Sequence, residues 1–220
     1  MMEATASLTA NSRPIGLDEL VRLVAGFEPS RRAVVAIAGA PGSGKSTLAE
    51  RLVEQLNARA PGSAALLPMD GFHYDDSVLI ARGLRVRKGA PETFDVLGLY
   101  HLLDRLRRND EDEVAVPVFD RDLEIARAGA RIIPRGVRAL IVEGNYLLFD
   151  EPPWPRLRPM FDVAVAVDAS EDTLRKRLVE RWRSYNLPPA EIEAKVEGND
   201  MPNARAVIAR SSPADYVLRT

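Results

Sequence analysis

One segment of the sequence has residue types and a spacing that suit the binding of phosphate groups. The pattern G-x-x-x-x-G-K-[ST] is matched by Gly39-Ala40-Pro41-Gly42-Ser43-Gly44-Lys45-Ser46-Thr47. Its glycines let backbone N–H groups surround phosphate oxygens, and the start of the following helix adds partial positive charge. We expect this whole segment to bind a nucleotide, with Lys45 at the β- and γ-phosphates and the Ser46 hydroxyl on Mg²⁺. A glycine-rich turn with a coincidental Lys-Ser pair is the alternative interpretation.

Two acidic residues follow apolar segments that read as buried strands. Asp70 comes after Ala64–Pro68, where a carboxylate could take the proton of a hydroxyl group that attacks a phosphate. Glu143 ends the apolar run Val137–Val142 and resembles the metal-binding acid of a Walker B strand, although Asp is the more usual residue there. A solvated Asp-Gly turn and an ordinary strand end are the alternatives. We expect Asp70 to be a catalytic base and Glu143 to help hold Mg²⁺.

The elements that must position these residues alternate between strands and helices. The expected strands are short and mostly apolar on both faces, which is typical of a buried parallel sheet. This alternation predicts an α/β fold with a mostly parallel sheet flanked by helices, and the phosphate-binding segment makes it a P-loop NTPase fold. The expected strands are Ala33–Ala38, Ala64–Pro68, Val137–Val142 and Phe161–Val167, and the expected helices are Leu17–Val24, Thr47–Arg59, Val96–Arg108 and Ser170–Tyr185.

Two segments interrupt this alternation. Glu113–Ile133 is expected to form a small antiparallel insertion, and Leu187–Asn203, rich in Pro, Glu and Lys, is expected to form a mobile helical lid. No internal repeat and no linker divides the chain. We therefore expect a flexible N-terminal tail over residues 1–14 and a single domain over residues 15–220.

The composition excludes several classes of protein. The 220 residues include 30 Lys and Arg against 32 Asp and Glu, a net charge of −2 that argues against a nucleic-acid binder working by bulk charge. The absence of Cys excludes disulfides, thiolate metal sites and a cysteine nucleophile. No apolar run reaches the roughly 18 residues of a membrane span, and Met1–Pro14 lacks the apolar core of a signal peptide. We expect a cytoplasmic protein without membrane insertion.

Further motifs follow one another between about Val34 and Arg183. They are Asp70-Gly71-Phe72, Arg87-Lys88-Gly89-Ala90-Pro91-Glu92-Thr93-Phe94-Asp95, Pro117-Val118-Phe119-Asp120-Arg121 and Glu143-Gly144. Together they resemble the motifs of the phosphoribulokinase and uridine kinase family of P-loop kinases, which also contains bacterial pantothenate kinase. Phe119 departs from the Tyr of that family's pattern. The segment Val196–Arg205 is most similar to a small bacterial subgroup of fructokinase-like proteins associated with sugar transport.

The resemblance implies roles for individual residues. It makes Asp70 the catalytic base and Lys45 and Ser46 the phosphate and metal ligands, as the residue types already indicate. It adds basic and acidic residues at the substrate, whose alternatives are a solvated basic loop and exposed charge on a hairpin. With His73, which follows closely after Asp70, the residues expected at the substrate are Asp70, His73, Arg87, Lys88, Asp120, Arg121 and Glu143.

Two arginines are four residues apart in the expected helix Ser170–Tyr185. Arg177 and Arg181 therefore share one face of this helix. In P-loop kinases a lid helix at this place commonly carries arginines that offset the negative charge developing on the transferred phosphoryl group. We expect at least one of the two to be catalytic. Salt bridging on the helix surface, to Glu171 or Glu180, is the alternative.

The resemblance implies an enzyme that uses ATP and Mg²⁺ to phosphorylate a hydroxyl group of a small metabolite. A sugar similar to fructose is the first expectation for this acceptor, and a nucleoside such as uridine, or pantothenate, is the alternative. A nucleotide-dependent switch is a function of another class, but the sequence lacks the Asn-Lys-x-Asp element that reads guanine. A kinase of nucleic-acid ends conflicts with the mildly acidic charge. The oligomeric state stays open, with a homodimer as one option.

Overall fold

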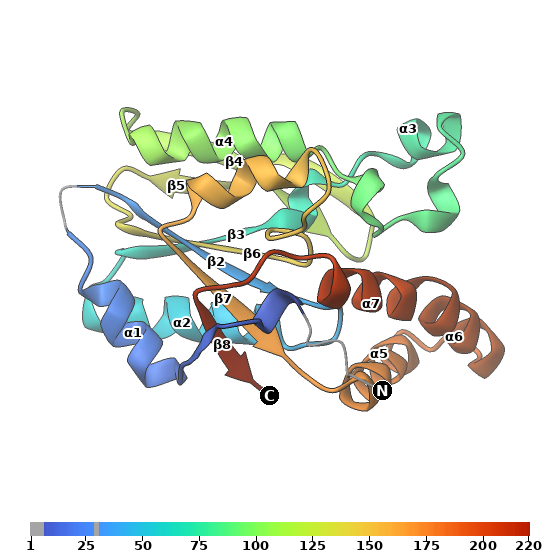
Figure 1. Cartoon of the computed structure of the whole chain (residues 1–220). Coiled ribbons are helices and arrows are strands. Elements are labelled where there is room, and N and C mark those ends of the chain that lie inside the picture. The colour runs from blue at the N-terminus through green and yellow to red at the C-terminus, as the bar shows by residue number, and fades with distance from the viewer. Residues whose placement is uncertain (1–6, 29–30) are drawn as a thin grey trace.

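The apolar segments of the sequence form one parallel sheet in the computed structural model, which describes residues 7–28 and 31–220 (Figure 1). The strand order is β1-β8-β7-β2-β6-β3, and every neighbouring pair is parallel. The predicted α/β fold with a mostly parallel sheet is therefore confirmed. The strands are β1 (Arg13–Pro14), β2 (Ala33–Gly39), β3 (Ala64–Pro68), β6 (Ala139–Gly144), β7 (Val163–Asp168) and β8 (Tyr216–Arg219).

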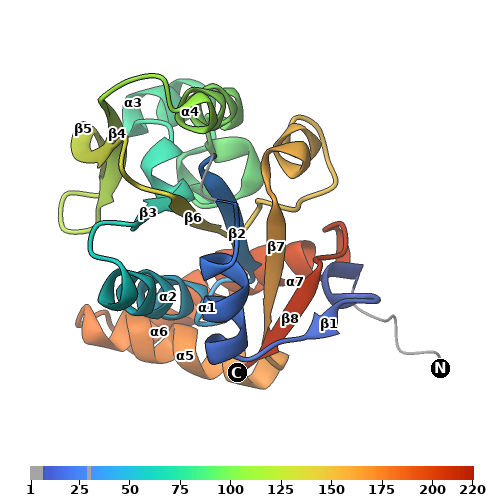
Figure 2. The same cartoon turned by 90° about the vertical axis from the view of Figure 1, so that its left-hand side faces the viewer.

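Helices cover both faces of this sheet. Successive residues of a strand point to opposite faces, and the central strand β2 is apolar and buried on both of them. Val34 and Ala36 of β2 pack on the face covered by α4 (Val96–Arg108) and by the 3₁₀-helix η5 (Trp154–Met160). Val35 and Ile37 pack on the other face, under α1 (Leu17–Ala25) and α2 (Lys45–Arg59). Figure 2 shows α4 on one side of the strands and α1 and α2 on the other. Two apolar cores thus fix the central strands from both sides.

A third group of helices follows β7 and packs at one end of the sheet (Figure 1). Ser170 begins it as an N-cap, because its hydroxyl accepts a hydrogen bond from the backbone N–H of Thr173. Residues 187–203, predicted to form a helical lid, are largely helical, while their mobility stays a prediction. The elements are α5 (Glu171–Ser184), α6 (Pro189–Lys195), a π-helical turn η6 (Val196–Asp200) and α7 (Met201–Ala209).

The segment between α4 and β6 forms the predicted antiparallel insertion. Strands β4 (Glu113–Asp120) and β5 (Ile125–Pro134) pair with each other as a separate sheet, with a bulge between Val116 and Val118. We call this pair the hairpin. Short elements connect β3 to α4, namely η2 (Met69–Phe72), α3 (Asp76–Ala81), η3 (Arg85–Arg87) and η4 (Pro91–Thr93).

The structure differs from the sequence prediction at the two ends of the chain. Residues 7–14, expected in a loose tail, form the 3₁₀-helix η1 (Ser7–Thr9) and β1, and Leu8 is buried. The edge strands β1 and β8 were not predicted, because both are short and gain their hydrogen bonds only from strands distant in sequence. The rest of the expected tail, residues 1–6, lies outside the described residues. None of the described helices combines the length and apolarity needed to cross a membrane.

Candidate active site

The phosphate loop, residues 40–44, connects β2 to α2 as the sequence predicts. Gly42 and Gly44 have φ angles of +82° and +90°, a left-handed backbone that favours glycine. A side chain at Gly42 would also stand 3.1 Å from the carbonyl oxygen of Leu174, because α5 packs against the loop. The loop therefore has its shape from local glycines and its support from a distant helix.

Arg177 of α5 braces the phosphate loop from outside. Its Nη1 atom donates to the carbonyl oxygens of Gly42 and Ser43, at 3.3 and 3.2 Å, and to the Thr220 hydroxyl at 3.0 Å. Thr220 in turn donates to the Ser43 carbonyl at 3.0 Å. Arg177 was predicted at the transferred phosphoryl group, but here its contacts are with the loop backbone and with Thr220.

A cavity of about 910 Å³ opens between the phosphate loop, the hairpin, the segment after β3 and the helices that follow β7, which we call the lid helices. Residues 41–47, apart from Ser43, form what we call its phosphate end, and Asp70 and the side chains around it form its acceptor end. The residues of the predicted site that line the cavity are Pro41, Gly42, Gly44, Lys45, Ser46, Thr47, Asp70, His73, Lys88, Arg121 and Arg181. The predicted residues outside its lining are Gly39, Ala40, Ser43, Arg87, Asp120, Glu143 and Arg177.

Asp70 lies in η2, directly after β3, where the carboxyl ends of parallel strands meet ligands. Its Oδ2 atom accepts a hydrogen bond from Nη2 of Arg121 on the hairpin at 2.8 Å. Burial alone would raise the pKa of Asp70, but the charges of His73, Arg121 and Lys45 outweigh burial, so this pKa lies below its usual range. The carboxylate is therefore ionised at neutral pH.

Glu143 lies at the end of β6, beside the start of α2. Its Oε2 atom accepts a hydrogen bond from the Ser46 hydroxyl at 3.1 Å. Burial raises the pKa of Glu143, while the charge of Lys45 opposes this rise. Burial disfavours the ionised form of the Glu143 carboxyl group. A divalent cation bound beside Glu143 and Ser46 would favour that ionised form, because its positive charge attracts the carboxylate.

His73 stands between two aromatic rings at the acceptor end, with ring centroids 4.0 Å from Phe94 and 4.7 Å from Phe119. Its Nδ1 atom lies 2.8 Å from the backbone carbonyl oxygen of Asp70. A carbonyl oxygen only accepts, so Nδ1 carries the proton. Burial lowers the pKa of His73, although the charge of Asp70 opposes this, and the neutral ring then has an unprotonated Nε2. This nitrogen is a hydrogen-bond acceptor.

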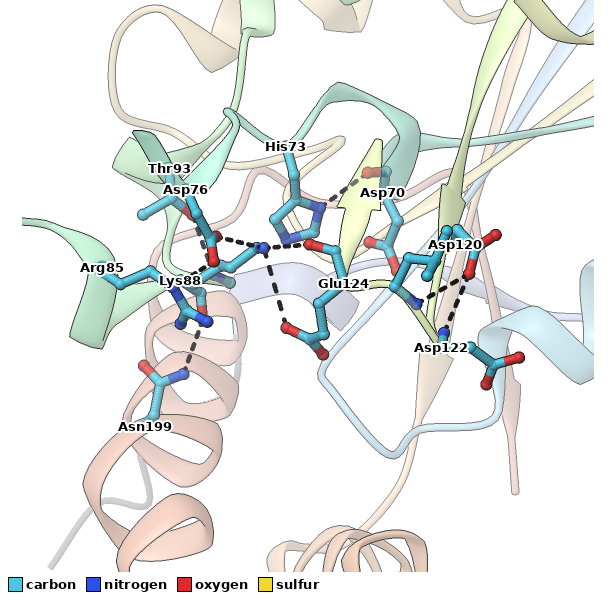
Figure 3. Close-up of polar contacts among 12 residues, drawn as sticks. Asp70, His73, Asp76, Arg85, Lys88, Thr93, Asp120, Asp122, Glu124 and Asn199 are labelled. Atoms are coloured by element: carbon cyan, nitrogen blue, oxygen red, sulfur yellow. Dashed lines mark hydrogen bonds and ion pairs between the residues drawn. The ribbon is translucent and has the colours of Figure 1, made fainter. Parts of the chain in front are cut away.

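Arg87 and Lys88 are neighbours in the sequence, but they have different environments. Arg87 is half exposed and pairs with Glu92 at 2.6 Å. Lys88 is buried, and its Nζ atom donates to Oδ1 of Asp76 at 2.7 Å and to the carbonyl oxygen of Glu124 at 2.6 Å, as Figure 3 shows. Lys88 therefore ties the segment after β3 to the turn of the hairpin.

Asp120 was predicted at the substrate, but its carboxylate organises the hairpin turn. Oδ1 accepts from the backbone N–H groups of Asp122 and Leu123, both at 3.1 Å (Figure 3). Oδ2 pairs with Arg127 across the hairpin at 3.0 Å. The neighbouring Arg121 is the residue of this motif that enters the cavity.

The lid side of the cavity carries Arg181 and Trp182 of α5. The guanidinium of Arg181 lies over the Trp182 ring, and the ammonium of Lys195 lies 4.6 Å from the centroid of the same ring. The indole N–H of Trp182 donates to Asp200 at 2.6 Å, and Arg181 lies 3.4 Å from that carboxylate. These contacts hold a cation over the cavity.

Among the cavity-lining residues that sequence reasoning missed are Trp182, Asp200 and Asn145. Asn145 had a usable signal, because it directly follows the Glu143-Gly144 motif at a strand end. Trp182 had none. Asp200 lies in the segment Val196–Arg205, but that segment does not indicate the contact with Trp182, because only the fold brings α5 and η6 together.

Comparison with known proteins places the chain in a family of kinases. The model of the phosphoribulokinase/uridine kinase family matches residues 34–215. A crystal structure from Silicibacter sp. TM1040, provisionally named a fructose transport system kinase, is 42% identical with a TM-score of 0.86, and the match covers 93% of this chain and 99% of that one. A protein of Schizosaccharomyces pombe, provisionally named a uridine kinase, is 33% identical over 92% of this chain and 89% of its own length.

A pantothenate kinase of Parvibaculum lavamentivorans is 33% identical over 69% of this chain, which spans 48% of that relative. All three relatives carry the name of a kinase, which favours phosphoryl transfer over a nucleotide-dependent switch. Kinases of this family use ATP. Since the matched residues include the whole phosphate end and Asp70, the protein is a small-molecule kinase of the phosphoribulokinase and uridine kinase family.

Proposed function

We propose that the protein transfers the γ-phosphoryl group of ATP to a hydroxyl group of a sugar, with Asp70 as the base. The observation that carries this proposal is that Asp70, with its lowered pKa, lines the same cavity as Lys45 and Ser46. An ionised carboxylate is the form that can accept a proton. As the acceptor oxygen bonds to the γ-phosphorus, the bond from that phosphorus to the bridging oxygen of ADP breaks, and the proton moves to Asp70.

The residues beside the phosphate loop fit a bound Mg²⁺. The Ser46 hydroxyl and the Glu143 carboxylate are 3.1 Å apart, and the charge of Asp70 adds to the burial that raises the pKa of Glu143. Oxygen ligands therefore gather next to the expected phosphates, and Mg²⁺ is commonly held by one or two carboxylates together with substrate phosphates. Ser46 and Glu143 would hold the ion, which when bound neutralises charge on the phosphates.

We assign the two arginines of α5 different tasks. Arg181 lines the cavity and is the cation that we place at the transferred phosphoryl group. Arg177 contacts the backbone of the phosphate loop and keeps that loop in shape. Positive charge held ready at the place where negative charge develops lowers the barrier most effectively.

The charges at the acceptor end favour a neutral acceptor. Arg85 and Lys88 pair with Asp76 at 2.7 Å each, and Arg121 pairs with Asp70 at 2.8 Å. An acceptor with a carboxylate, such as pantothenate, would have to break one of these pairs to gain a cation. A sugar need not do so. The name of the Silicibacter structure points in the same direction, and we propose a sugar similar to fructose, with a nucleoside as the alternative.

The substitution Asp70→Asn tests the proposed base. It keeps the shape of the side chain but cannot accept the proton, so we expect kcat to fall by about 10³-fold while ATP still binds. Acceptor-stimulated ADP release gives kcat, and titration calorimetry gives the affinity for ATP. Asp122→Asn is the matched control, because Asp122 is exposed on the hairpin turn and its activity should equal that of the unmodified protein.

The acceptor is found by measuring ADP release with fructose, uridine and pantothenate, followed by wider sets of sugars, nucleosides and vitamin precursors. Stimulation by a sugar alone supports the proposed acceptor, and stimulation by uridine alone replaces it with a nucleoside. Near-normal turnover of the Asp70→Asn variant with any acceptor would refute the role of Asp70.

A further inference from the structure

Asn145 stands beside Asp70 at the end of the sheet. In the parallel pair β3 and β6, Pro68 is in register with Glu143, and Asp70 and Asn145 each follow two residues later. The two segments remain close beyond the paired residues, because a side chain at Gly144 would lie 2.5 Å from Cβ of Met69. Both Asp70 and Asn145 line the cavity. An acceptor bound at Asp70 therefore has Asn145 at the end of the neighbouring strand, in the same cavity.

The side-chain amide of Asn145 lacks a partner within the described part of the chain. Its Oδ1 atom is buried and accepts no hydrogen bond there. Folded proteins satisfy the large majority of buried polar atoms, because a buried polar atom without a hydrogen bond destabilises the fold. An apolar residue of the same size would avoid this cost. An unpaired amide that lines a cavity beside the catalytic base is instead suited to a ligand that supplies the missing donor.

The other groups of the acceptor end also favour a ligand rich in hydroxyl donors. The ionised Asp70 accepts hydrogen bonds only, and the neutral ring of His73 has an unprotonated Nε2. Two nearby cations have carboxylate partners already, since Arg121 pairs with Asp70 and Lys88 pairs with Asp76. The acceptor end thus offers several hydrogen-bond acceptors to a ligand and few free charges.

We propose that Asn145 hydrogen-bonds a second hydroxyl group of the acceptor, apart from the one that is phosphorylated, and so makes the enzyme specific for polyols. This inference rests on the proposed function. Asn145 takes no part in the bond changes at phosphorus. It acts on specificity, because a site built to bond a hydroxyl leaves a buried polar group unpaired when that hydroxyl is missing.

The test uses Asn145→Leu, which removes the amide at nearly constant volume. We expect the KM for the acceptor to rise about 10-fold or more, because one buried hydrogen bond is lost, while the KM for ATP stays within about twofold. A series of deoxy analogues of the acceptor sharpens the test. The unmodified protein should discriminate against one analogue by about 10-fold or more, and the Asn145→Leu variant should lose this discrimination.

A melting experiment without ligands separates this role from a structural one. Because the amide has no partner to lose, Asn145→Leu should leave Tm unchanged or raise it. The matched control is Asn57→Leu, since Asn57 exchanges two hydrogen bonds with the backbone of Ala64, at 3.0 and 2.9 Å. This control should lower Tm and leave the acceptor KM unchanged.

The outcomes distinguish the inference from the proposed function. Absence of ADP release from the unmodified protein with every acceptor overturns the proposed function. The melting experiment then still shows whether the Asn145 amide stabilises the fold. A fall in Tm as large as that of Asn57→Leu makes the amide structural and overturns the inference. An unchanged acceptor KM in an active Asn145→Leu variant overturns the inference alone.

Discussion

Consecutive residues build the phosphate end of the cavity, whereas separate segments build its acceptor end. At the phosphate end, the loop before α2 offers backbone N–H groups, and Arg177 supports it from behind. At the acceptor end, Asp70 follows β3, Lys88 follows η3, Arg121 lies at the hairpin and Asn145 follows β6. Arg121 joins the hairpin to Asp70 by an ion pair, and Lys88 donates a hydrogen bond to the carbonyl oxygen of Glu124 in the hairpin turn.

The difference between the two ends separates the general part of the chemistry from the specific part. The phosphate groups are the same in every nucleoside triphosphate. A contiguous loop of backbone N–H donors can therefore bind them whatever acceptor the kinase uses. An acceptor is recognised by where side chains stand, and those positions depend on how the hairpin and the segment after β3 pack. Substitutions at the phosphate end should therefore change the KM for the nucleotide. Substitutions at the acceptor end should change the pKa of the base Asp70 or the choice of acceptor.

After Asp70→Asn, the next largest expected effects concern the two arginines of α5. Arg181→Ala should lower kcat by about 100-fold, because it removes a cation from the developing negative charge. Arg177→Ala should raise the KM for ATP by about 10-fold, because it removes two charged hydrogen bonds to the loop. Steady-state kinetics with varied ATP separates the two effects.

The control for this pair is Lys176→Ala, which removes an exposed cation from the same helix and should change neither parameter. The assignment of separate tasks would be wrong if both arginine variants changed kcat alone to the same degree.

A smaller effect is expected from Arg121→Gln, which should change the pH dependence of kcat. Arg121 lowers the pKa of Asp70 by its charge and by its hydrogen bond, against the effect of burial. The base works when ionised, so the rate falls as pH drops through this pKa. Without Arg121 the pKa rises, and the acidic limb of the kcat profile should move to higher pH. Arg127→Gln, on the same hairpin but paired with Asp120, should leave the limb in place; movement to lower pH in Arg121→Gln would contradict this account.

The smallest effect is expected from Asp120→Ala. Its carboxylate bonds the turn of the hairpin and does not line the cavity, so kcat/KM should stay within about threefold of its original value. Tm should fall, because the turn loses its two backbone hydrogen bonds. A loss of kcat/KM as large as that of Arg181→Ala would return Asp120 to the substrate site.

Much of the fold and of the phosphate end followed from the sequence. The glycines of the phosphate loop, the apolar strands and the start of the helix at Ser170 are local features, and the structure has them where they were expected. The short strands β1 and β8 were missed, because each forms only beside a strand that is distant along the chain. The contacts of Arg177 and Asp120 were not expected for a similar reason, since neither helical spacing nor a motif reveals the partners of these side chains.

The sequence by itself determined the chemistry of phosphate binding and named Asp70 and Glu143 as the acids near it. These signals are local, because a loop of glycines and an acid after a strand have the same meaning wherever the strand lies. Only the tertiary structure decided which charged groups are already paired and which arginine reaches the cavity. It also decided that Asn145 lines the same cavity as Asp70 and that its buried Oδ1 atom accepts no hydrogen bond from any described residue. These properties depend on distances between segments far apart in the chain, and packing sets those distances.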